Sequence, residues 1–173
     1  FSQERVVGFV LQKNAKLNEP SSSDLYAVGT LSHIERMIKS DGEINAQVKG
    51  LSRIKIIEYV QDAPYLMARV KEIEDDATDS PEIKALTNHL INEFRRAVNL
   101  GKFVDFLVFM NVMSDNSASQ LADLVASVLD LKPMEKQEFL EELNVKNRLE
   151  RIIEVLAKEI KVLELEKKIA SKT

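Results

Sequence analysis

The feature that most constrains this chain is an uninterrupted amphipathic stretch near its end, from Asn144 to Ile169. No glycine or proline interrupts it, and its apolar residues recur three and four positions apart, which is the spacing of one helix face. They are Val145, Leu149, Ile152, Ile153, Leu156, Ile160 and Leu163. At about 1.5 Å per residue such a helix is roughly 39 Å long, which exceeds the radius of a domain of this size. We therefore predict one long helix from about residue 144, capped by Asn144, with a projecting far end.

The first part of the chain carries the patterns of β-strands. Val6 to Leu11 is a short apolar run that predicts a buried strand, and the polar stretch from Lys13 to Asp24 predicts a loop. The Asp41-Gly42 pair predicts a hairpin turn, and apolar and polar residues alternate strictly after it. Because a hairpin needs a strand on both sides, we interpret Val28 to Lys39 as a strand, although its apolar spacing would also suit a helix.

Two further features belong to this strand-rich part. Gly50 interrupts an alternation that resumes in phase at Ile54 and Ile56, which predicts a bulge or bend in one long, curved strand. Alternation from Leu66 to Val70 predicts another strand, followed by an acidic loop at residues 74–76.

Helical patterns replace the strands after this loop. Ser80-Pro81 predicts an N-cap with proline in the first turn, and apolar residues follow at helical spacing until Gly101. The segment from Phe103 to Met113 is apolar on nearly every face, residues 121–129 form another amphipathic stripe, and Pro133 begins a short helix. Strands followed by helices predict an α+β protein of two lobes, a β-rich lobe at residues 1–76 and a helical lobe at residues 79–173.

Composition limits the classes of function. The chain has 173 residues, of which 45% are hydrophobic and 30% are charged, as in a globular protein. A net charge of −4 argues against a nucleic-acid binder that depends on phosphate neutralisation. Cysteine is absent, which excludes disulfides and thiolate metal sites, and no apolar run is long enough to cross a bilayer. Because the chain begins at Phe1 rather than at methionine, we expect it to be a piece of a longer protein.

Three stretches in order resemble a known family. They are DLYAVGTLSHIERM with VKGLSRIKI after the turn, then LADLVASVLDL, then KQEFLEELNVKNRLERIIEVLAKEIKVLELEKKI. Together they resemble the N-terminal, substrate-recognition domain of the Lon family of ATP-dependent proteases, over nearly the whole chain and with the expected lengths between the blocks.

The resemblance implies a small β barrel of the PUA-like type, a helical lobe, and a long helix leading to an AAA+ ATPase and a peptidase domain. It further implies that the parent is an ATP-dependent serine endopeptidase with a Ser-Lys dyad that uses ATP and magnesium. The resemblance also implies that the parent is a homohexamer, located in the bacterial cytoplasm or alternatively in the mitochondrial matrix. Two departures stand out: the family's first strand and helix are absent, and the segment from Phe103 to Met113 is more apolar than is usual.

The residues themselves support no catalysis and no cofactor in this chain. There is no phosphate-binding loop of the form GxxxxGK[ST], and no serine lies in a G-x-S-x-G elbow. The two histidines, His33 and His89, lack the spacing of metal ligands, so we interpret both as structural or exposed. The acidic run from Glu72 to Asp76 is interpreted as a solvated turn, and Arg95-Arg96 as solvent-facing. We expect no enzyme activity from this chain alone.

Two apolar groups are candidate binding residues. The candidate substrate contacts are Phe103, Phe106, Phe109, Met110 and Met113, because Phe and Met suit surfaces that bind varied apolar sequences. We expect Phe109 to lie on an open face; the alternative is a core helix buried on all sides. The candidate self-association residues are Leu156, Ile160 and Leu163, of which Ile160 and Leu163 are expected to lie beyond the body of the domain with little to pack on.

Two hypotheses of function follow. The first is a noncatalytic domain that captures unfolded, damaged or degron-bearing proteins for a ring-shaped ATP-dependent protease and contributes to ring assembly. The second is a free-standing PUA-like module that binds nucleic acid or protein, with its helices as a dimerisation arm. Binding to nucleic acid weakens steeply with salt and binding to apolar peptides does not, so salt dependence separates the two. No membrane partner is expected.

Overall fold

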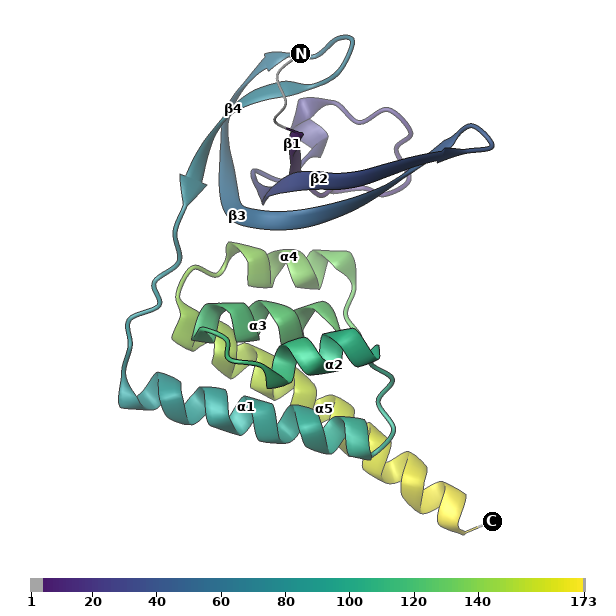
Figure 1. The fold of residues 1–173 in the computed structure, drawn as a ribbon, viewed down its shortest axis with the longest axis vertical. Helices are drawn as coiled ribbons and strands as arrows, with labels where there is room; N and C mark the ends of the chain where they lie inside the picture. The colour runs from purple at the N-terminus through teal and green to yellow at the C-terminus, as the bar shows by residue number, and fades with distance from the viewer. Residues whose placement is uncertain (1–4, 173) are drawn as a thin grey trace. The chain divides into compact units, whose positions relative to one another are not determined.

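The computed structural model describes residues 5–172. The chain divides into two compact units, Phe1–Glu74 and Asp75–Thr173, the first built from strands and the second from helices (Figure 1).

The first unit is one antiparallel sheet with the strand order β1-β2-β3-β4. Its strands are β1 (Val6–Phe9), β2 (Val28–Ser40), β3 (Glu43–Gln61) and β4 (Met67–Ile73), and a short 3-10 helix, η1 (Ser22–Asp24), lies in the loop before β2. Each strand pairs with its neighbour in the chain. β1 and β4 are therefore the edges, and the expected barrel is not closed within the described residues.

Local turn chemistry accounts for the β2–β3 hairpin. Asp41 and Gly42 have φ angles of 50° and 81°, the left-handed pair that a tight hairpin turn requires. The register shifts where Leu31 pairs with Ser52 while Ser32 pairs with Gly50, so Leu51 is an extra residue. The bulge expected near Gly50 is confirmed.

The strand predicted from Val6 to Leu11 is shorter and less buried than expected. β1 ends at Phe9, and the Phe9 side chain is 47% exposed. The prediction of burial is wrong because β1 is an edge strand in a unit where Ile54 is the one fully buried aliphatic residue among those described. Gly29 of β2 lies directly against Phe9, where a Cβ atom would overlap the Phe9 carbonyl oxygen.

The second unit contains five α-helices in the described part of the chain. They are α1 (Pro81–Asn99), α2 (Phe106–Met113), α3 (Ala118–Ser127), α4 (Pro133–Glu141) and α5 (Val145–Ser171). Ser80 caps α1 by accepting a hydrogen bond from the Ile83 amide at 3.2 Å, and Asn144 caps α5 by accepting one from the Asn147 amide at 3.0 Å. Both predicted caps are confirmed.

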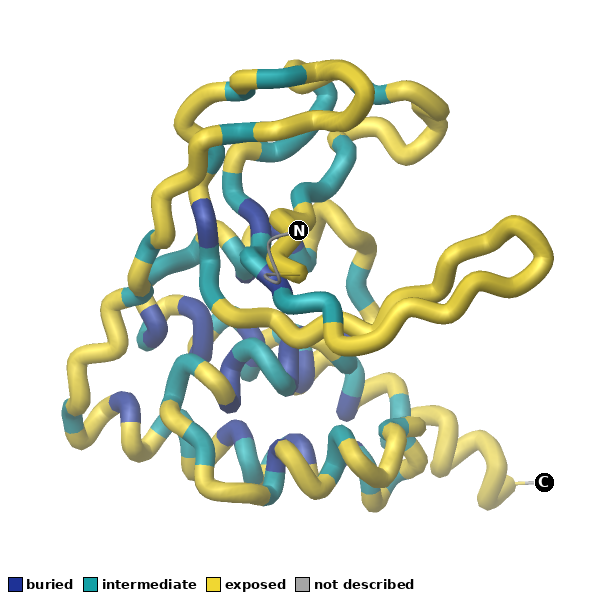
Figure 2. The backbone as a smooth tube through the Cα atoms, turned by 45° about the horizontal axis from the view of Figure 1, so that its top comes forward, coloured by how far each residue is buried: buried dark blue, intermediate teal, exposed yellow. Residues whose placement is uncertain are grey.

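The core of the helical unit lies between α1, α3 and α5. Leu90 and Phe94 of α1 and Leu149 and Ile152 of α5 are fully buried, as are Ala122 and Val125 of α3. Figure 2 shows the buried positions gathered on the inner sides of these helices. The core is formed by the apolar stripes that the sequence predicts for these helices.

The far end of α5 extends past the other helices (Figure 1). The last buried residue of α5 is Ile160, and every residue from Leu165 to Lys172 is exposed. The expectation that Ile160 and Leu163 lie beyond the body is wrong, since Ile160 is 3% exposed and Leu163 packs against the core. The reason is that α1, with 19 residues and a length of about 28 Å, runs alongside α5 and covers this stretch.

Candidate functional site

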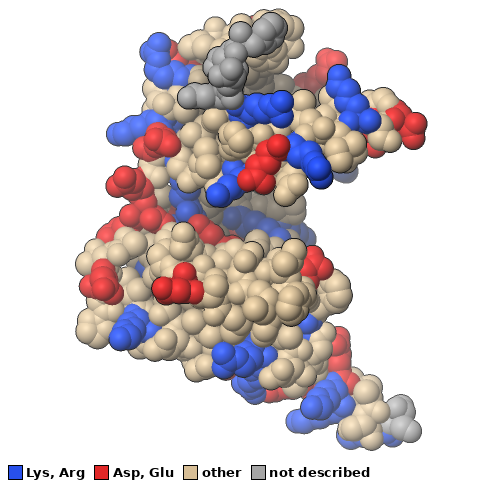
Figure 3. Space-filling view, viewed as in Figure 1, with Lys and Arg blue, Asp and Glu red and all other residues tan. Residues whose placement is uncertain are grey.

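The largest exposed apolar side chains of the helical unit lie on and just before α2. The side chain of Phe103 is 87% exposed, those of Phe106 and Leu107 are 74% and 75% exposed, and that of Met110 is 49% exposed. We call these four residues the α2 surface. Figure 3 shows that the space-filling surface over this part of the helical unit carries few charged side chains. Exposed apolar side chains gathered on one segment are typical of interaction sites, which makes the α2 surface the candidate binding site.

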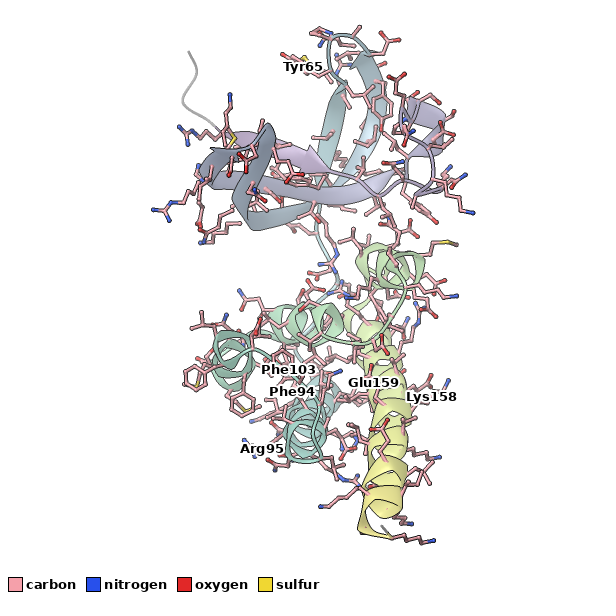
Figure 4. All side chains as sticks on the ribbon, turned by 90° about the vertical axis from the view of Figure 1, so that its right-hand side faces the viewer. Tyr65, Phe94, Arg95, Phe103, Lys158 and Glu159 are labelled. Atoms are coloured by element: carbon pink, nitrogen blue, oxygen red, sulfur yellow. The ribbon has the colours of Figure 1, made fainter. Side chains whose placement is uncertain are left out.

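The opposite face of α2 holds the helix on the core. Val112 is fully buried, and Val108, Phe109 and Met113 pack partly buried against the core. The ring of Phe109 stacks on that of Phe94 in α1, with centroids 6.1 Å apart and an interplanar angle of 25°. Figure 4 labels Phe94 on α1 and Phe103 in the segment that joins α1 to α2.

These positions divide the predicted substrate contacts. Phe103, Phe106 and Met110 lie on the open side, whereas Phe109 and Met113 lie on the packed side. The expectation of an open face at Phe109 is therefore wrong, because its ring is the partner of Phe94. Leu107 is a further exposed residue that was not among the predicted contacts; its place next to Phe106, on a helix that is apolar on nearly every face, gave no signal of its orientation.

Polar contacts fix both ends of this segment. Before α2, the Lys102 ammonium group lies 2.6 Å from the Glu159 carboxylate, whose other oxygen accepts a hydrogen bond from the Asp130 amide at 2.7 Å. After α2, the Asn116 side-chain amide donates to the Asn111 carbonyl at 2.7 Å. The Lys102–Glu159 pair is mostly buried, with side chains 10% and 17% exposed, so the α2 surface is presented by a well-anchored scaffold.

The predicted self-association residues do not form an exposed stripe. Leu156 is fully buried and Ile160 nearly so, because both face the core, and Leu163 is half-buried. Their side chains are thus occupied within the unit. The exposed apolar residues of the far part of α5 are Val162, Leu165 and Ile169, which follow one another three and four positions apart.

A buried arginine, which the sequence analysis did not single out, organises the start of the helical unit. Arg148 is fully buried and donates to the Asp75 carboxylate at 3.1 Å, the Asp123 carboxylate at 3.3 Å and the Glu142 carbonyl at 2.7 Å. The Ser119 hydroxyl also bonds to Asp75. Asp75 is therefore a structural partner, which corrects the interpretation of the whole acidic run as a solvated turn. The available signal was the position of Arg148 between Val145 and Ile152 on the apolar face.

The strand unit contains an apolar cleft of about 290 Å³. Tyr59 projects its hydroxyl group into a place without water access, where no hydrogen-bond partner exists among the described residues. Burial raises the pKa of this phenol above its usual value. The cleft is lined by Gly8, Val10, Leu25, Leu31, Ile54, Ile56, Tyr59, Leu66, Ala68 and Val70.

The remaining candidates do not assemble into a chemical site. His33 lies on β2 and His89 on α1, and across residues 5–172 no group of three or more His, Asp or Glu side chains is placed to hold a metal ion. Arg95 and Arg96 are both exposed, as expected, and Arg96 pairs with Glu93 at 3.6 Å. Within the same residues, no helix has the length and apolar character that a membrane crossing requires.

Comparison with solved structures defines the class of fold. The chain is similar to the N-terminal domain of the Lon protease of the Mycobacterium avium complex, with a TM-score of 0.62 and 23% identity, over 89% of this chain and 90% of that one. A Lon N-terminal domain protein from Xanthomonas campestris matches with a TM-score of 0.53 and 18% identity, over 86% and 88% of the two chains. The fold is that of Lon N-terminal domains.

The sequence comparisons show the family. The model of the ATP-dependent protease La (LON) substrate-binding domain matches residues 2–158, and the chain belongs to this family. It is 36% identical over 169 residues to the Lon protease of Heliobacterium modesticaldum and 38% identical over 159 residues to that of Syntrophomonas wolfei. These matches cover 97% and 91% of this chain but only 21% and 20% of the relatives. The chain thus spans about a fifth of their length, and the resemblance stated from the sequence is confirmed.

Proposed function

We propose that this domain captures unfolded or damaged polypeptides for a Lon protease through the α2 surface. The observation that carries the proposal is the division of α2 into two faces. Phe109 and Val112 secure the helix to the core, while Phe106 and Leu107 are about three-quarters exposed. A side chain that packs on nothing in its own unit is free to pack on a client, and unfolded proteins expose the apolar segments that such a surface accepts.

Each capture is weak on energetic grounds. Burial of one Phe or Leu side chain contributes about 1.5–3 kcal/mol, and the association of two chains consumes much of the gain from a few such residues. Several copies in one assembly raise the effective affinity without any new contact. We therefore propose that the domain acts as part of a homo-oligomer, a hexamer, in which the exposed stripe Val162, Leu165 and Ile169 contributes to self-association.

Membership in the family supports a proposal for the whole protein. We infer an ATP-dependent serine endopeptidase with an AAA+ ATPase and a Ser-Lys dyad, using ATP and magnesium and acting in the bacterial cytoplasm. The support is the description of the matched family as part of an ATP-dependent protease and the name of the bacterial relatives. On this proposal other domains of the protein carry out catalysis, and the present domain binds the polypeptide substrate.

Paired substitutions on the two faces of α2 test the proposal. Phe106→Ser with Leu107→Ser removes exposed side chains and is expected to change the free energy of unfolding by less than about 1 kcal/mol. Phe109→Ser removes the ring that stacks on Phe94 and is expected to cost about 2 kcal/mol or more. Binding is measured as fluorescence anisotropy of a carboxymethylated, permanently unfolded reporter protein. The double variant should lose most of the affinity while remaining folded; unchanged affinity would contradict the proposal.

Salt separates this proposal from nucleic-acid binding. Apolar capture should hold or strengthen when the salt concentration is raised, because it does not depend on released counterions. A single-stranded oligonucleotide serves as the second probe in the same buffer series. Tight oligonucleotide binding that falls steeply with salt, together with weak reporter binding, would favour the nucleic-acid hypothesis instead.

A further inference from the structure

Within residues 5–172, the outer part of the β2–β3 hairpin is a two-stranded arm without a third strand. The β1 register with β2 ends at the pair Val6 and His33, and the β4 register with β3 begins at Arg53. We call residues 36–48 the hairpin arm. Figures 1 and 2 show this arm extending away from the rest of its sheet, with all of its residues exposed. The outer edge of β3 along the arm has no strand partner among the described residues.

The register makes the two faces of the arm unlike each other. Met37 pairs with Ala46, Lys39 with Ile44, and Ile34 at the base with Val48, and directly paired residues share a face. One face therefore carries Met37, Ile44, Ala46 and Val48 with the single charge of Lys39. The other carries Arg36, Ile38, Ser40, Glu43, Asn45 and Gln47, which is polar except for Ile38. The arm is an amphipathic ribbon.

The apolar face is open to solvent. The side chains of Met37 and Ile44 are 50% and 60% exposed, and that of Val48 is 40% exposed. Isolated two-stranded hairpins are marginally stable in water, so an exposed apolar face on one indicates that it packs against something. The apolar face consists of four side chains, Met37, Ile44, Ala46 and Val48, whereas a stable protein–protein interface takes about 20–30 residues a side, which argues against a second copy of this chain as the occupant.

The free edge of β3 points to the kind of occupant. A strand edge offers backbone N–H and C=O groups to any extended polypeptide, whatever its sequence, and the face beside it accepts alternate apolar side chains. Both properties suit clients of varied sequence. We propose that the hairpin arm is a second client-binding surface, on which an extended apolar segment of an unfolded protein adds to the edge of β3 and lays alternate side chains over Met37 and Ile44. This inference rests on the proposed function and adds a site distinct from the α2 surface.

Matched isoleucines on the two faces of the arm provide the test. Ile44 and Ile38 are 60% and 54% exposed, so Ile44→Ser and Ile38→Ser make the same chemical change at similar exposure in the same hairpin. The full chain is assayed with the carboxymethylated reporter and with a short peptide of alternating valine and threonine. Ile44→Ser combined with Met37→Ser should weaken peptide binding roughly five- to tenfold, and Ile38→Ser should change it less than about twofold.

A second measurement addresses the backbone contacts without altering the protein. A peptide that is N-methylated at alternate residues on one edge cannot form main-chain hydrogen bonds with β3. It should therefore bind the unchanged chain as weakly as the unmethylated peptide binds the variant with both Met37→Ser and Ile44→Ser. Equal effects of Ile44→Ser and Ile38→Ser, or full affinity of the N-methylated peptide, would overturn the inference. The inference would also be overturned if analytical ultracentrifugation showed a dimer of the chain that Ile44→Ser dissociates while peptide binding is unchanged.

The α2 variant separates this inference from the proposed function. Reporter binding that is lost in the Phe106 and Leu107 variant but unchanged in the Met37 and Ile44 variant would overturn the role of the arm and leave the proposed function standing. Reporter binding that is unchanged in both variants would overturn both.

Discussion

Replacing Arg148 with alanine tests whether its buried polar network stabilises the helical unit. Arg148 is fully buried, and it donates hydrogen bonds to Asp75, Asp123, Ser119 and the Glu142 carbonyl. Its removal takes the Arg148 guanidinium away from the Asp75 carboxylate, which is only 19% exposed, and from the Asp123 carboxylate, which is 43% exposed and more easily hydrated. Removal of one partner from a buried ion pair costs about 3–5 kcal/mol, a large share of the 5–15 kcal/mol typical of a domain.

The assay is urea unfolding of the full chain followed by circular dichroism at 222 nm, which reports the helices. Lys146→Ala is the control, because Lys146 is an exposed cation that pairs with Glu82 at 3.1 Å, and solvent-exposed pairs of this kind contribute little to stability. Arg148→Met keeps most of the stem volume and should recover about 1 kcal/mol of the packing loss. An Arg148→Ala variant as stable as the Lys146→Ala variant would refute the assigned role of the buried network.

Three further predictions concern local structure. Burial raises the pKa of Tyr59 above its ordinary value near 10, so the folded state favours the neutral phenol; this contribution to stability is present below about pH 10 and is lost as the pH rises through the folded-state pKa. Urea titrations near pH 9 and pH 11 should therefore show a smaller alkaline loss for Tyr59→Phe than for the unchanged chain, and equal losses would contradict the assignment. Gly29→Ala should cost roughly 1–3 kcal/mol because the new methyl group meets the Phe9 carbonyl, whereas Gly50→Ala, with its nearest neighbour at 3.5 Å, is the tolerated control in thermal unfolding. Ser80→Ala should cost about 1 kcal/mol through the lost cap on the Ile83 amide, and Ser80→Asn should restore it.

The features that the sequence predicted correctly are those that local chemistry determines. The Asp41-Gly42 turn requires positive φ angles that aspartate and glycine supply, and the strands on either side follow from it. The Ser80 and Asn144 caps likewise depend only on neighbouring backbone amides. Closure of a barrel, by contrast, depends on pairing between distant strands, which alternation does not encode, and the sheet is open in the described residues.

The orientation of α2 could not be predicted, because a segment that is apolar all round has no amphipathic phase. Which face packs depends on Phe94, a residue on another helix, whose ring stacks on Phe109. The burial of Ile160 depends in the same way on how far α1 runs along α5. The sequence thus indicated the segment that carries the candidate site but not the side chains that it exposes.

Photo-crosslinking shows whether the α2 surface contacts unfolded clients. A photoreactive amino acid replaces Leu107 in one variant and Met134 of α4 in the other, since these side chains are exposed at 75% and 58% in the same unit. Each variant is irradiated with the carboxymethylated reporter and, separately, with the same reporter in its native fold. We expect crosslinks from position 107 to the unfolded reporter alone, at a yield well above that from position 134. Equal yields from the two positions, or equal yields with the folded reporter, would contradict it.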